Sequence, residues 1–458
     1  MTTRPTISWS DLAGSAVGLW GLGVEGGANL RRLRAEGVTP LLVDDDPVGR
    51  ELDGLPVLGA AGGGLEALAR CEVVVKTPGI SRYRPDVTAL EAAGVAVVGG
   101  LGLWMQGVDR SRVVCITGTK GKSTTTAIVG HLLGALGHRC LVAGNIGRPP
   151  YDPDVGDDYD FFAVETSSFQ ATDLAASPPV VAVTALHPDH LDWHGDVDTY
   201  YRDKLSACTQ PGAALTVANG DSPELAARAS SLGPQVRWVR ADAPESAWSG
   251  ALGLDGAHNR RNAGIARACL EALGIAAAAD DDALRAAAVG FAPLDSRLRT
   301  IGAVSGVTFV DDSLSTNALS VIAALDTFDA RPVALLVGGQ DRGVDYGELG
   351  PHLRGRLHPT LVVTLPANGP RIGAAVRAAD PGADVVDCDD LESAVAAAFA
   401  WAEPRGGAVL LSPGAPSFGQ FTNYRARAEA FAAAVRALAD PDAPMDGQAA
   451  DGGFSSSR

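Results

Sequence analysis

The stretch from 113 to 126, VVCITGTKGKSTTT, decides the fold of the middle of the chain. Its first four residues predict a short buried strand, and the following TAIVGHLLGALG predicts a helix. A strand that runs through glycines into a helix aims backbone N–H groups and the helix dipole at one point, which suits a phosphate. We therefore expect the following residues to bind a nucleotide phosphate: Gly118, Thr119, Lys120, Gly121, Lys122, Ser123 and Thr124.

Two residues of this loop have distinct expected roles. Lys122 would place its ammonium on the outer phosphates, and Ser123 would offer its hydroxyl to Mg²⁺. The loop is one residue shorter than the general G-x-x-x-x-G-K-[ST] pattern, because only Thr119 and Lys120 separate Gly118 from Gly121. The strand before it and the helix after it favour phosphate binding over an ordinary strand-to-helix turn.

The composition is that of a globular protein built from several domains. The 458 residues are 46% hydrophobic and 20% charged, and this length suggests about three domains. The net charge of -17 argues against broad binding to nucleic acid or to an anionic membrane surface. Because no apolar leader or membrane span is evident, we expect a cytoplasmic protein. The six cysteines form no C-x-x-C pair, which indicates reduced, mostly buried thiols.

The first predicted domain, residues 1–109, alternates strands and helices. A strand over 15–20 enters the glycine turn Gly21, Gly23 and Gly26, and a second strand ends at Asp44. This pattern suits a dinucleotide, with Asp44 on a ribose as in NAD enzymes. The same turn suits another diphosphate, or closes a helix onto a sheet without any ligand. Nothing in this domain resembles hydride-transfer machinery.

The second predicted domain, residues 110–292, carries polar side chains where its strands end. Ligands in open α/β sheets lie beyond the carboxyl ends of strands, so these side chains are expected to share one crevice. Their oxygens and a histidine suit hard divalent ions, Mg²⁺ or Mn²⁺. The residues at these strand ends are Asn145, Glu165, Ser167, Gln170, Asp189 and His190.

The third predicted domain, residues 293–439, repeats the alternation of strands and helices. Its polar strand ends fall at 312–316, 338–342 and 412–417. Strands and helices that alternate in this way predict a doubly wound α/β fold. The tail, residues 440–458, has no apolar period and is expected to be disordered.

Eight motifs in one order give the chain a specific resemblance. They are GTKGKSTTT, GNIGRP, VETSSFQ, HPDHLDWHG, GAHNRRN, VDDSLSTN, LVGGQDRGVDY and LSPGAPSFGQF. This set resembles the Mur ligases, and among them the MurD type, over the chain up to the tail. The resemblance implies a Rossmann-like UDP-binding domain, a central P-loop ATPase domain with a mostly parallel sheet, and a C-terminal Rossmann-like domain for the acceptor amino acid.

The resemblance also implies an activity. Mur ligases of this type form a C–N bond in peptidoglycan precursor synthesis, and so serve cell wall biogenesis. The expected reaction adds glutamate to UDP-N-acetylmuramoyl-L-alanine through an acyl phosphate and releases ADP and phosphate. The expected cofactors are ATP and Mg²⁺ at two sites, with Mn²⁺ as a substitute, and we expect a monomer.

Residue roles follow from the resemblance, position by position. Lys122, His190 and Lys204 would be catalytic, although Lys204 alone reads as a surface lysine. Ser123 and Glu165 would hold one Mg²⁺, and His190 with a carbamylated Lys204 the second. The nucleotide would also contact Asn259, Arg297 and Asp312. The UDP-sugar and the incoming glutamate would contact Val24, Glu25, Asn145, Ser167, Gln170, Arg342, Ser417 and Tyr424.

Departures from the family pattern cluster on the acceptor side. They are Leu314 for a lysine, Ser296 for a histidine, Arg342 for a lysine, Tyr424 for a phenylalanine and Ala185 for an asparagine. The phosphate and metal motifs are kept, so the added amino acid is expected to be held differently. GTKGKSTTT, HPDHLDWHG and LSTN resemble more closely the variant that adds L-glutamate and leaves inversion to a separate epimerase. The alternative is the ordinary D-glutamate-adding ligase.

Three other functions fit part of the sequence. A folylpolyglutamate synthetase-like ligase shares the ATP chemistry but not a UDP-binding first domain. An NAD-dependent oxidoreductase would use the glycine turn for its cofactor. A non-catalytic nucleotide-binding protein would keep the loop without glutamate-dependent phosphate release.

The expected acceptor site yields a first prediction. Glutamate and the acidic protein repel each other, so an arginine in the site should matter more than its single charge suggests. Arg342→Ala is expected to raise the KM for glutamate much more than the KM for ATP in steady-state kinetics. Equal effects on both constants would remove Arg342 from the acceptor site.

Overall fold

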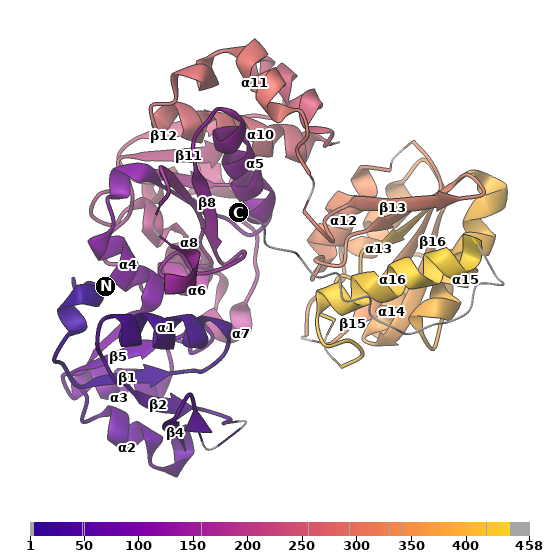
Figure 1. The fold of residues 1–458 in the computed structure, drawn as a ribbon. Coiled ribbons are helices and arrows are strands. Elements are labelled where there is room, and N and C mark those ends of the chain that lie inside the picture. The colour runs from indigo at the N-terminus through magenta and orange to yellow at the C-terminus, as the bar shows by residue number, and fades with distance from the viewer. Residues whose placement is uncertain are drawn as a thin grey trace, which may run out of the picture. The chain divides into compact units, whose positions relative to one another are not determined.

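The computed structural model describes residues 4–47, 49, 51–156, 158–254, 256–292, 294–328, 330–341, 343–417 and 419–439. The chain forms two compact units, Met1–Ala292 and Pro293–Arg458. Within the described ranges, the strands form three six-stranded sheets (Figure 1). These mostly parallel sheets confirm the expected α/β class. The domain limits drawn from the sequence stay predictions, and the tail 440–458 lies outside the described residues.

The first sheet has the order β3-β4-β2-β1-β5-β6 and is parallel except for β3. Because β2 and β5 lie on opposite sides of β1, a crevice for a ligand is expected beyond the carboxyl ends of β1 and β5. Helix α1 covers one face and α2 the other (Figure 1). The elements are β1 Val17–Trp20, α1 Val24–Ala35, β2 Leu41–Asp44, β3 Glu51–Leu52, β4 Leu55–Gly59, α2 Gly64–Leu68, β5 Val73–Lys76, α3 Pro85–Ala92, β6 Ala96–Gly99 and α4 Gly100–Gly107.

The second sheet has the order β12-β11-β10-β7-β9-β8 and is parallel throughout. Its central strand β7 is buried along its whole length, which explains why it reads as a continuous apolar run. The elements are β7 Val113–Thr117, α5 Lys122–Ala135, β8 Cys140–Gly144, β9 Phe161–Glu165, α6 Ser168–Ala171, β10 Val180–Val183, α7 Leu191–His194, α8 Val197–Leu205, β11 Leu215–Asn219, α9 Pro223–Ala227, β12 Val236–Val239, α10 Ala257–Ala272 and α11 Asp281–Ala288.

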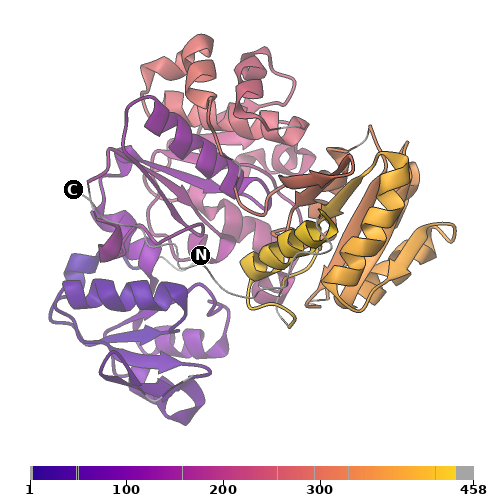
Figure 2. The same cartoon turned by 45° about the vertical axis from the view of Figure 1, so that its right-hand side comes forward.

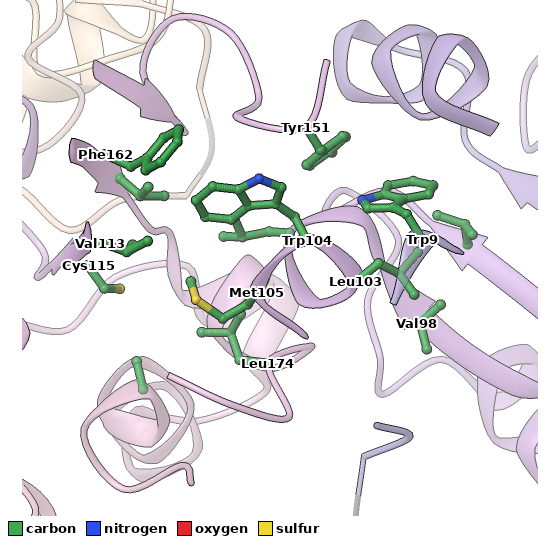
Figure 3. Close-up of a cluster of buried hydrophobic side chains, with 14 of the residues drawn as sticks. Trp9, Val98, Leu103, Trp104, Met105, Val113, Cys115, Tyr151, Phe162 and Leu174 are labelled. Atoms are coloured by element: carbon green, nitrogen blue, oxygen red, sulfur yellow. The ribbon is translucent and has the colours of Figure 1, made fainter. Parts of the chain in front are cut away.

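The first and second sheets share one hydrophobic core. This cluster joins residues such as Leu19 of β1 to Val113 of β7. Figure 3 shows its aromatic part, where Trp104 of α4 meets Phe162 of β9 with ring centroids 5.4 Å apart. Buried aromatic rings of this size contribute much of the energy of such a joint. Residues up to Ala292 therefore pack as one body with two sheets.

The third sheet forms the second unit, in orange and yellow in Figure 2. Its order is β13-β14-β18-β15-β16-β17, and only the β13–β14 pair is antiparallel. The elements are β13 Arg299–Val304, β14 Val307–Asp311, α12 Ala318–Asp326, β15 Val333–Gly339, α13 Leu349–Gly355, β16 Thr360–Ala367, α14 Gly369–Ala379, β17 Asp384–Asp387, α15 Leu391–Ala402, β18 Ala408–Leu411 and α16 Tyr424–Ala439.

All six cysteines are free thiols, three of them buried and three half-buried. In the described ranges, no helix is both long enough and apolar enough to cross a bilayer.

A buried ion network crosses from the first sheet to the second. The carboxylate of Asp173, which follows α6, accepts a 2.7 Å hydrogen bond from Lys76 Nζ at the end of β5 and another 2.7 Å bond from Arg82 Nε. All three side chains are at most 3% exposed. Burial alone would raise the pKa of Asp173, but Arg82 and Lys76 outweigh it and hold that pKa below its usual value. Asp173 thus pairs with both buried cations, and Glu91 also accepts a 2.6 Å hydrogen bond from Arg82 Nη1.

Removing this carboxylate should destabilise the first unit. Asp173→Asn removes the anion that Lys76 contacts and leaves Arg82 paired only with Glu91, so it is expected to lower the free energy of unfolding by about 3–5 kcal/mol in urea denaturation at pH 7. Because the folded pKa is depressed, the contribution is present above the unfolded pKa of about 3.9 and is lost as the pH falls through the folded pKa.

The matched control is Asp158→Asn, which breaks an ion pair with Arg139 whose aspartate side chain is 81% exposed. Solvent screens such a pair, so little change is expected. If Asp173→Asn and Asp158→Asn unfold at the same urea concentration, the buried network does not stabilise the fold.

Candidate active site

The phosphate loop lies at the carboxyl end of β7, and α5 begins at Lys122. Gly118 and Gly121 have φ angles of 134° and 86°, in the left-handed region that favours glycine. A Cβ on Gly118 would lie 2.2 Å from Thr184 Oγ1, and one on Gly121 would lie 2.8 Å from Asn262 Oδ1. Both positions therefore require glycine, for their conformation and for the space around them.

Thr119 faces the protein and fixes the loop. Its N–H donates to the carbonyl of Ala185 at 2.7 Å. Its hydroxyl lies 3.1 Å from the carbonyl oxygen of His187 and 2.9 Å from the hydroxyl of Tyr200. The sequence pattern predicts Thr119 among the phosphate-binding residues. In the structure its own N–H and hydroxyl bond to the protein behind the loop and stabilise the loop from that side.

The residues after Thr119 form the positive end of α5. The first backbone bond of the helix runs from Thr125 N–H to Gly121 O at 2.9 Å, so the amides before it lie where the helix dipole favours an anion. Lys122 and Ser123 lie in this first turn and are half-buried. The Lys122 ammonium lies 3.3 Å from the carbonyl of Thr119. This arrangement suits a polyphosphate.

Glu165 ends β9, the neighbour of β7, and is 1% exposed. Its Oε1 accepts a 2.8 Å hydrogen bond from Asn145 Nδ2 at the end of β8. Its Oε2 is buried and has no hydrogen-bond partner among the described residues. A buried carboxylate oxygen without a partner is costly, and a bound cation would relieve that cost.

Lys204 is buried behind the loop. This side chain of α8 is 2% exposed, and its Nζ donates to the carbonyl of Gly118 at 3.1 Å. Burial, joined by the charge of Lys122, lowers the pKa of Lys204 well below its usual range, while Asp189 and Glu165 act in the opposite direction. The interpretation of Lys204 as a surface lysine is therefore wrong, and its burial agrees with the family pattern.

His190 and Asp189 lie between β10 and α7. His190 has a φ of 52°, a strained conformation for this residue type. Partial desolvation lowers the pKa of His190, Asp189 opposes this effect and Lys204 adds to it. The imidazole is thus neutral at pH 7, the form that binds metals. Burial would raise the pKa of Asp189, but the charge of Lys120 is the largest of the effects that hold it below its usual value.

The donor set fits a hard divalent cation in its chemistry. Among the residues described, no group of three or more His, Cys, Asp and Glu side chains is arranged to hold a metal ion. The expected set differs from such a group because it contains the hydroxyl of Ser123 and a modified Lys204. The unpartnered oxygen of Glu165 is the observation that favours a cation here.

Asn259 lies in the first turn of α10 and is buried. It is hydrogen-bonded to Asn262, one turn further on, at 3.5 Å. Because Asn262 lies against Gly121, the start of α10 is placed beside the phosphate loop. The structure thus brings this sequence-distant asparagine pair to the predicted nucleotide site.

Glu25 and Gln170 meet where the first two sheets join. Gln170 Nε2 donates to Glu25 Oε1 at 2.7 Å, and Gln170 also caps α6 together with Ser167. Burial raises the pKa of Glu25 to about 7, although its hydrogen bonds with Gln170 and Tyr151 oppose the shift. Three predicted substrate residues are therefore in one connected group.

The first-sheet turn offers two further observations. Val24 is 85% exposed at the start of α1, an unusual position for an apolar side chain that is free to contact a ligand. Asp44 accepts hydrogen bonds from the backbone N–H groups of Leu22, at 2.6 Å, and Asp46, at 3.0 Å. Asp44, which the dinucleotide pattern would place on a ribose, thus bonds to backbone groups of the glycine turn and of its own strand end.

Asp312 and Arg297 lie together in the second unit. Burial raises the pKa of Asp312 to about 7, although the charge of Arg297 and the 2.7 Å hydrogen bond from Ser412 lower it. Ser296 and Leu298 flank Arg297, and both have left-handed φ angles of 59° and 49°. Strain of this kind is common where side chains are held for function.

The remaining acceptor residues lie near the end of β18 and the start of α16. Ser417 is 4% exposed, and its carbonyl accepts the Phe421 N–H at 3.1 Å. Tyr424 is half-buried as the first residue of α16. Arg342, the third expected residue of this group, lies outside the described residues.

Arg427, which no sequence motif indicated, lies beneath these loops. Its side chain is 1% exposed, and its Nη2 donates to the carbonyls of Ser313 at 2.7 Å and Ala415 at 3.1 Å. Burial lowers the pKa of Arg427 to about 10, while Asp311 and Asp312 oppose the shift. An arginine on a helix with an apolar face gives little signal in the sequence, because its burial depends on distant loops.

Comparison with known families agrees with this geometry. Residues 116–266 match the Mur ligase middle domain, and residues 296–415 match the Mur ligase glutamate ligase domain. Among solved structures, UDP-N-acetylmuramate-alanine ligase MurC from Thermotoga maritima is similar with a TM-score of 0.56 and 16% identity, over 93% of this chain and 100% of that chain. At this identity the likeness concerns the fold.

Relatives of higher identity extend over nearly the whole chain. A protein of Xanthomonas euvesicatoria pv. vesicatoria named UDP-N-acetylmuramoyl-L-alanine–L-glutamate ligase is 41% identical over 92% of this chain and 95% of its own length. A Micromonospora protein of the same name is 40% identical over 93% of this chain and 98% of its own length. With the phosphate loop, the buried lysine behind it and the unpartnered glutamate beside it, these matches lead to one conclusion: the chain belongs to the Mur ligase family.

Proposed function

We propose that this Mur ligase joins L-glutamate to UDP-N-acetylmuramoyl-L-alanine, with ATP converted to ADP and phosphate. One observation carries the proposal: the phosphate loop, the orphan oxygen of Glu165 and the buried Lys204 converge at the carboxyl edge of the second sheet. The names and extent of the relatives support the substrates. The ordinary D-glutamate-adding reaction remains the alternative.

The site suits activation of a carboxylate. A free carboxylate does not form an amide in water, so it must first become an acyl phosphate by taking the outer phosphoryl group of ATP. Bringing a carboxylate to a triphosphate gathers negative charge. Lys122 and the first amides of α5 would offset that charge and hold the phosphates in line with the attacking oxygen. The amine of glutamate then attacks the acyl carbon, and phosphate leaves.

Ser123, Glu165, His190 and Lys204 would hold Mg²⁺, with Mn²⁺ as a substitute. When bound, the ions supply charge neutralisation and Lewis acidity at the phosphoryl group. The chain contributes the placement of the ligands, because Asn145 fixes Glu165 through Oε1 and leaves Oε2 for the ion.

Carbamylation of Lys204 would complete the ligand set. Addition of CO₂ to Nζ forms an N–C bond, releases a proton and turns a lysine into an anionic oxygen ligand. The buried position of Nζ behind Gly118, near Glu165 and Asp189, supports such a modification. An unmodified ammonium there would repel any cation beside it.

The acceptor side belongs to the second unit. We propose that Arg297 and Asp312 contact the nucleotide, and that Arg342, Ser417 and Tyr424 receive glutamate. The strained turn at Arg297 and the buried Ser417 support this assignment. We further propose a monomer that acts in the cytoplasm and a separate epimerase that inverts the product.

The phosphate and cation ligands yield a direct prediction. Lys122→Ala removes the loop ammonium and is expected to reduce the rate of phosphate release by about 100- to 1,000-fold. Glu165→Gln keeps the shape and the bond with Asn145 but lacks the charge, so it should raise the Mg²⁺ concentration needed for half-maximal rate. Glu66→Gln, an exposed position on α2, is the control. Wild-type rates in both site variants would refute the assigned machinery.

The choice of glutamate enantiomer is tested by substrate comparison. With UDP-N-acetylmuramoyl-L-alanine and ATP, L-glutamate should give faster phosphate release than D-glutamate in a preparation free of racemase and epimerase. Chiral analysis of the hydrolysed product checks that the added residue keeps the L configuration. Faster release with D-glutamate would establish the alternative.

A further inference from the structure

A chain of hydrogen bonds that is buried except at Tyr83, which is 46% exposed, lies beside the proposed metal ligands and has no part in the mechanism above. Ser168 Oγ lies 2.9 Å from His194 Nε2, and His194 Nδ1 lies 2.8 Å from Asp203 Oδ2. The hydroxyl of Tyr83 donates to the Asp203 carboxylate, with distances of 2.8 Å and 2.7 Å to its two oxygens. Ser168, His194 and Asp203 are buried.

The order of these groups is that of a Ser-His-Asp hydrolase triad. A nucleophile must be reached by its substrate, and Ser168 is only 1% exposed. The carboxylate also has a second partner in Tyr83, which ties it down instead of leaving it to serve the histidine alone. This chain of hydrogen bonds therefore holds structural elements in place and does not perform nucleophilic catalysis.

This chain of hydrogen bonds connects the loop after β5 to three helices, α6, α7 and α8, in the part of the protein that forms the second sheet. Tyr83 belongs to this loop, Asp203 to α8, His194 to the end of α7 and Ser168 to the start of α6. The same loop makes two further contacts with Trp193, which support the connection. Ser81 Oγ donates to the Trp193 carbonyl at 3.0 Å, and Trp193 Nε1 donates to the Pro78 carbonyl at 3.2 Å.

Tyr83, Asp203 and Ser168 each lie near a proposed site. The loop after β5 borders the crevice between β1 and β5, where a UDP-sugar is expected to bind. Asp203 directly precedes Lys204, whose Nζ contacts the phosphate loop at Gly118. Ser168 directly follows Ser167 and starts the short helix whose Gln170 contacts Glu25.

We propose that Tyr83 is a positioning residue that fixes the position of Lys204 through Asp203. The loop after β5 and the phosphate loop are thereby held in a fixed position relative to each other. The inference rests on the proposed function for the UDP-sugar and for the carbamate of Lys204. Its physical content is that the Tyr83 hydroxyl helps to hold the Asp203 carboxylate, which also contacts His194 and lies 3.6 Å from Arg202 Nη2. His194 extends the same constraint to Ser168.

The test uses variants that remove one hydroxyl each. Tyr83→Phe keeps the ring, which packs edge-on against Trp193 with ring centroids 5.9 Å apart. Ser168→Ala removes the hydroxyl that contacts His194 at the other end of the hydrogen-bond chain. Loss of one hydrogen bond to a carboxylate should lower kcat about tenfold. Tyr159→Phe, which loses a 3.0 Å bond to the Val155 carbonyl away from this chain, should leave kcat unchanged.

Two readouts separate positioning from general loss of structure. The double variant Tyr83→Phe/Ser168→Ala should lose clearly less than the product of the single losses, because both act through Asp203 and His194. After incubation with isotopically labelled bicarbonate, the carbamate resonance of Lys204 in carbon NMR should shift or weaken in Tyr83→Phe and not in Tyr159→Phe.

Unchanged kcat and carbamate resonance in Tyr83→Phe would overturn the inference, as would losses that multiply in the double variant. A wild-type protein that is inactive with UDP-N-acetylmuramoyl-L-alanine but carries the carbamate would count against the proposed substrate alone. The resonance in Tyr83→Phe would then decide the inference by itself. A wild-type protein with neither property would overturn both.

Discussion

The close approach of the phosphate loop to the end of β10 is the constraint on which the site depends. Gly118 passes so near Thr184 that a Cβ would lie 2.2 Å from its hydroxyl oxygen. Thr119 then bonds to Ala185, and the turn is fixed before α5 begins. Because the backbone is held from behind, the amides of the first turn and Lys122 face the side where a phosphate would lie. A side chain at Gly118 would push the loop away from the sheet and change the direction of every donor after it.

Charge arrangement is the second feature that defines the site. Burial and the charge of Lys122 lower the pKa of Lys204, while Asp189 and Glu165 act in the opposite sense. Lys204 and Glu165 are buried, and removing charges from water in this way is costly. Bound anionic reactants and cations would offset this cost. Perturbed groups that cluster at a sheet edge are typical of catalytic sites.

The joint between the first two sheets is the third feature. Its apolar part is the core around Trp104 and Phe162, which holds the two sheets as one unit. Its polar part includes the Asp173 network and the contact of Gln170 with Glu25. An apolar joint alone would tolerate small shifts, whereas directional hydrogen bonds fix a register. This is why substrate residues from the two sheets can be placed within one connected group.

The sequence by itself determined the alternation of strands and helices, the glycine loop of residues 118–121 and the family, because these depend on local periodicity and on short ordered motifs. It also placed Glu165 and Asn145 at strand ends, since parallel strands end at one edge. Only the tertiary structure decided that Lys204 is buried, that Thr119 faces inward and that Arg427 lies beneath the acceptor loops. Those outcomes depend on contacts between residues far apart in the chain, and a lysine or an arginine looks the same in the sequence whether solvent or a distant carbonyl surrounds it.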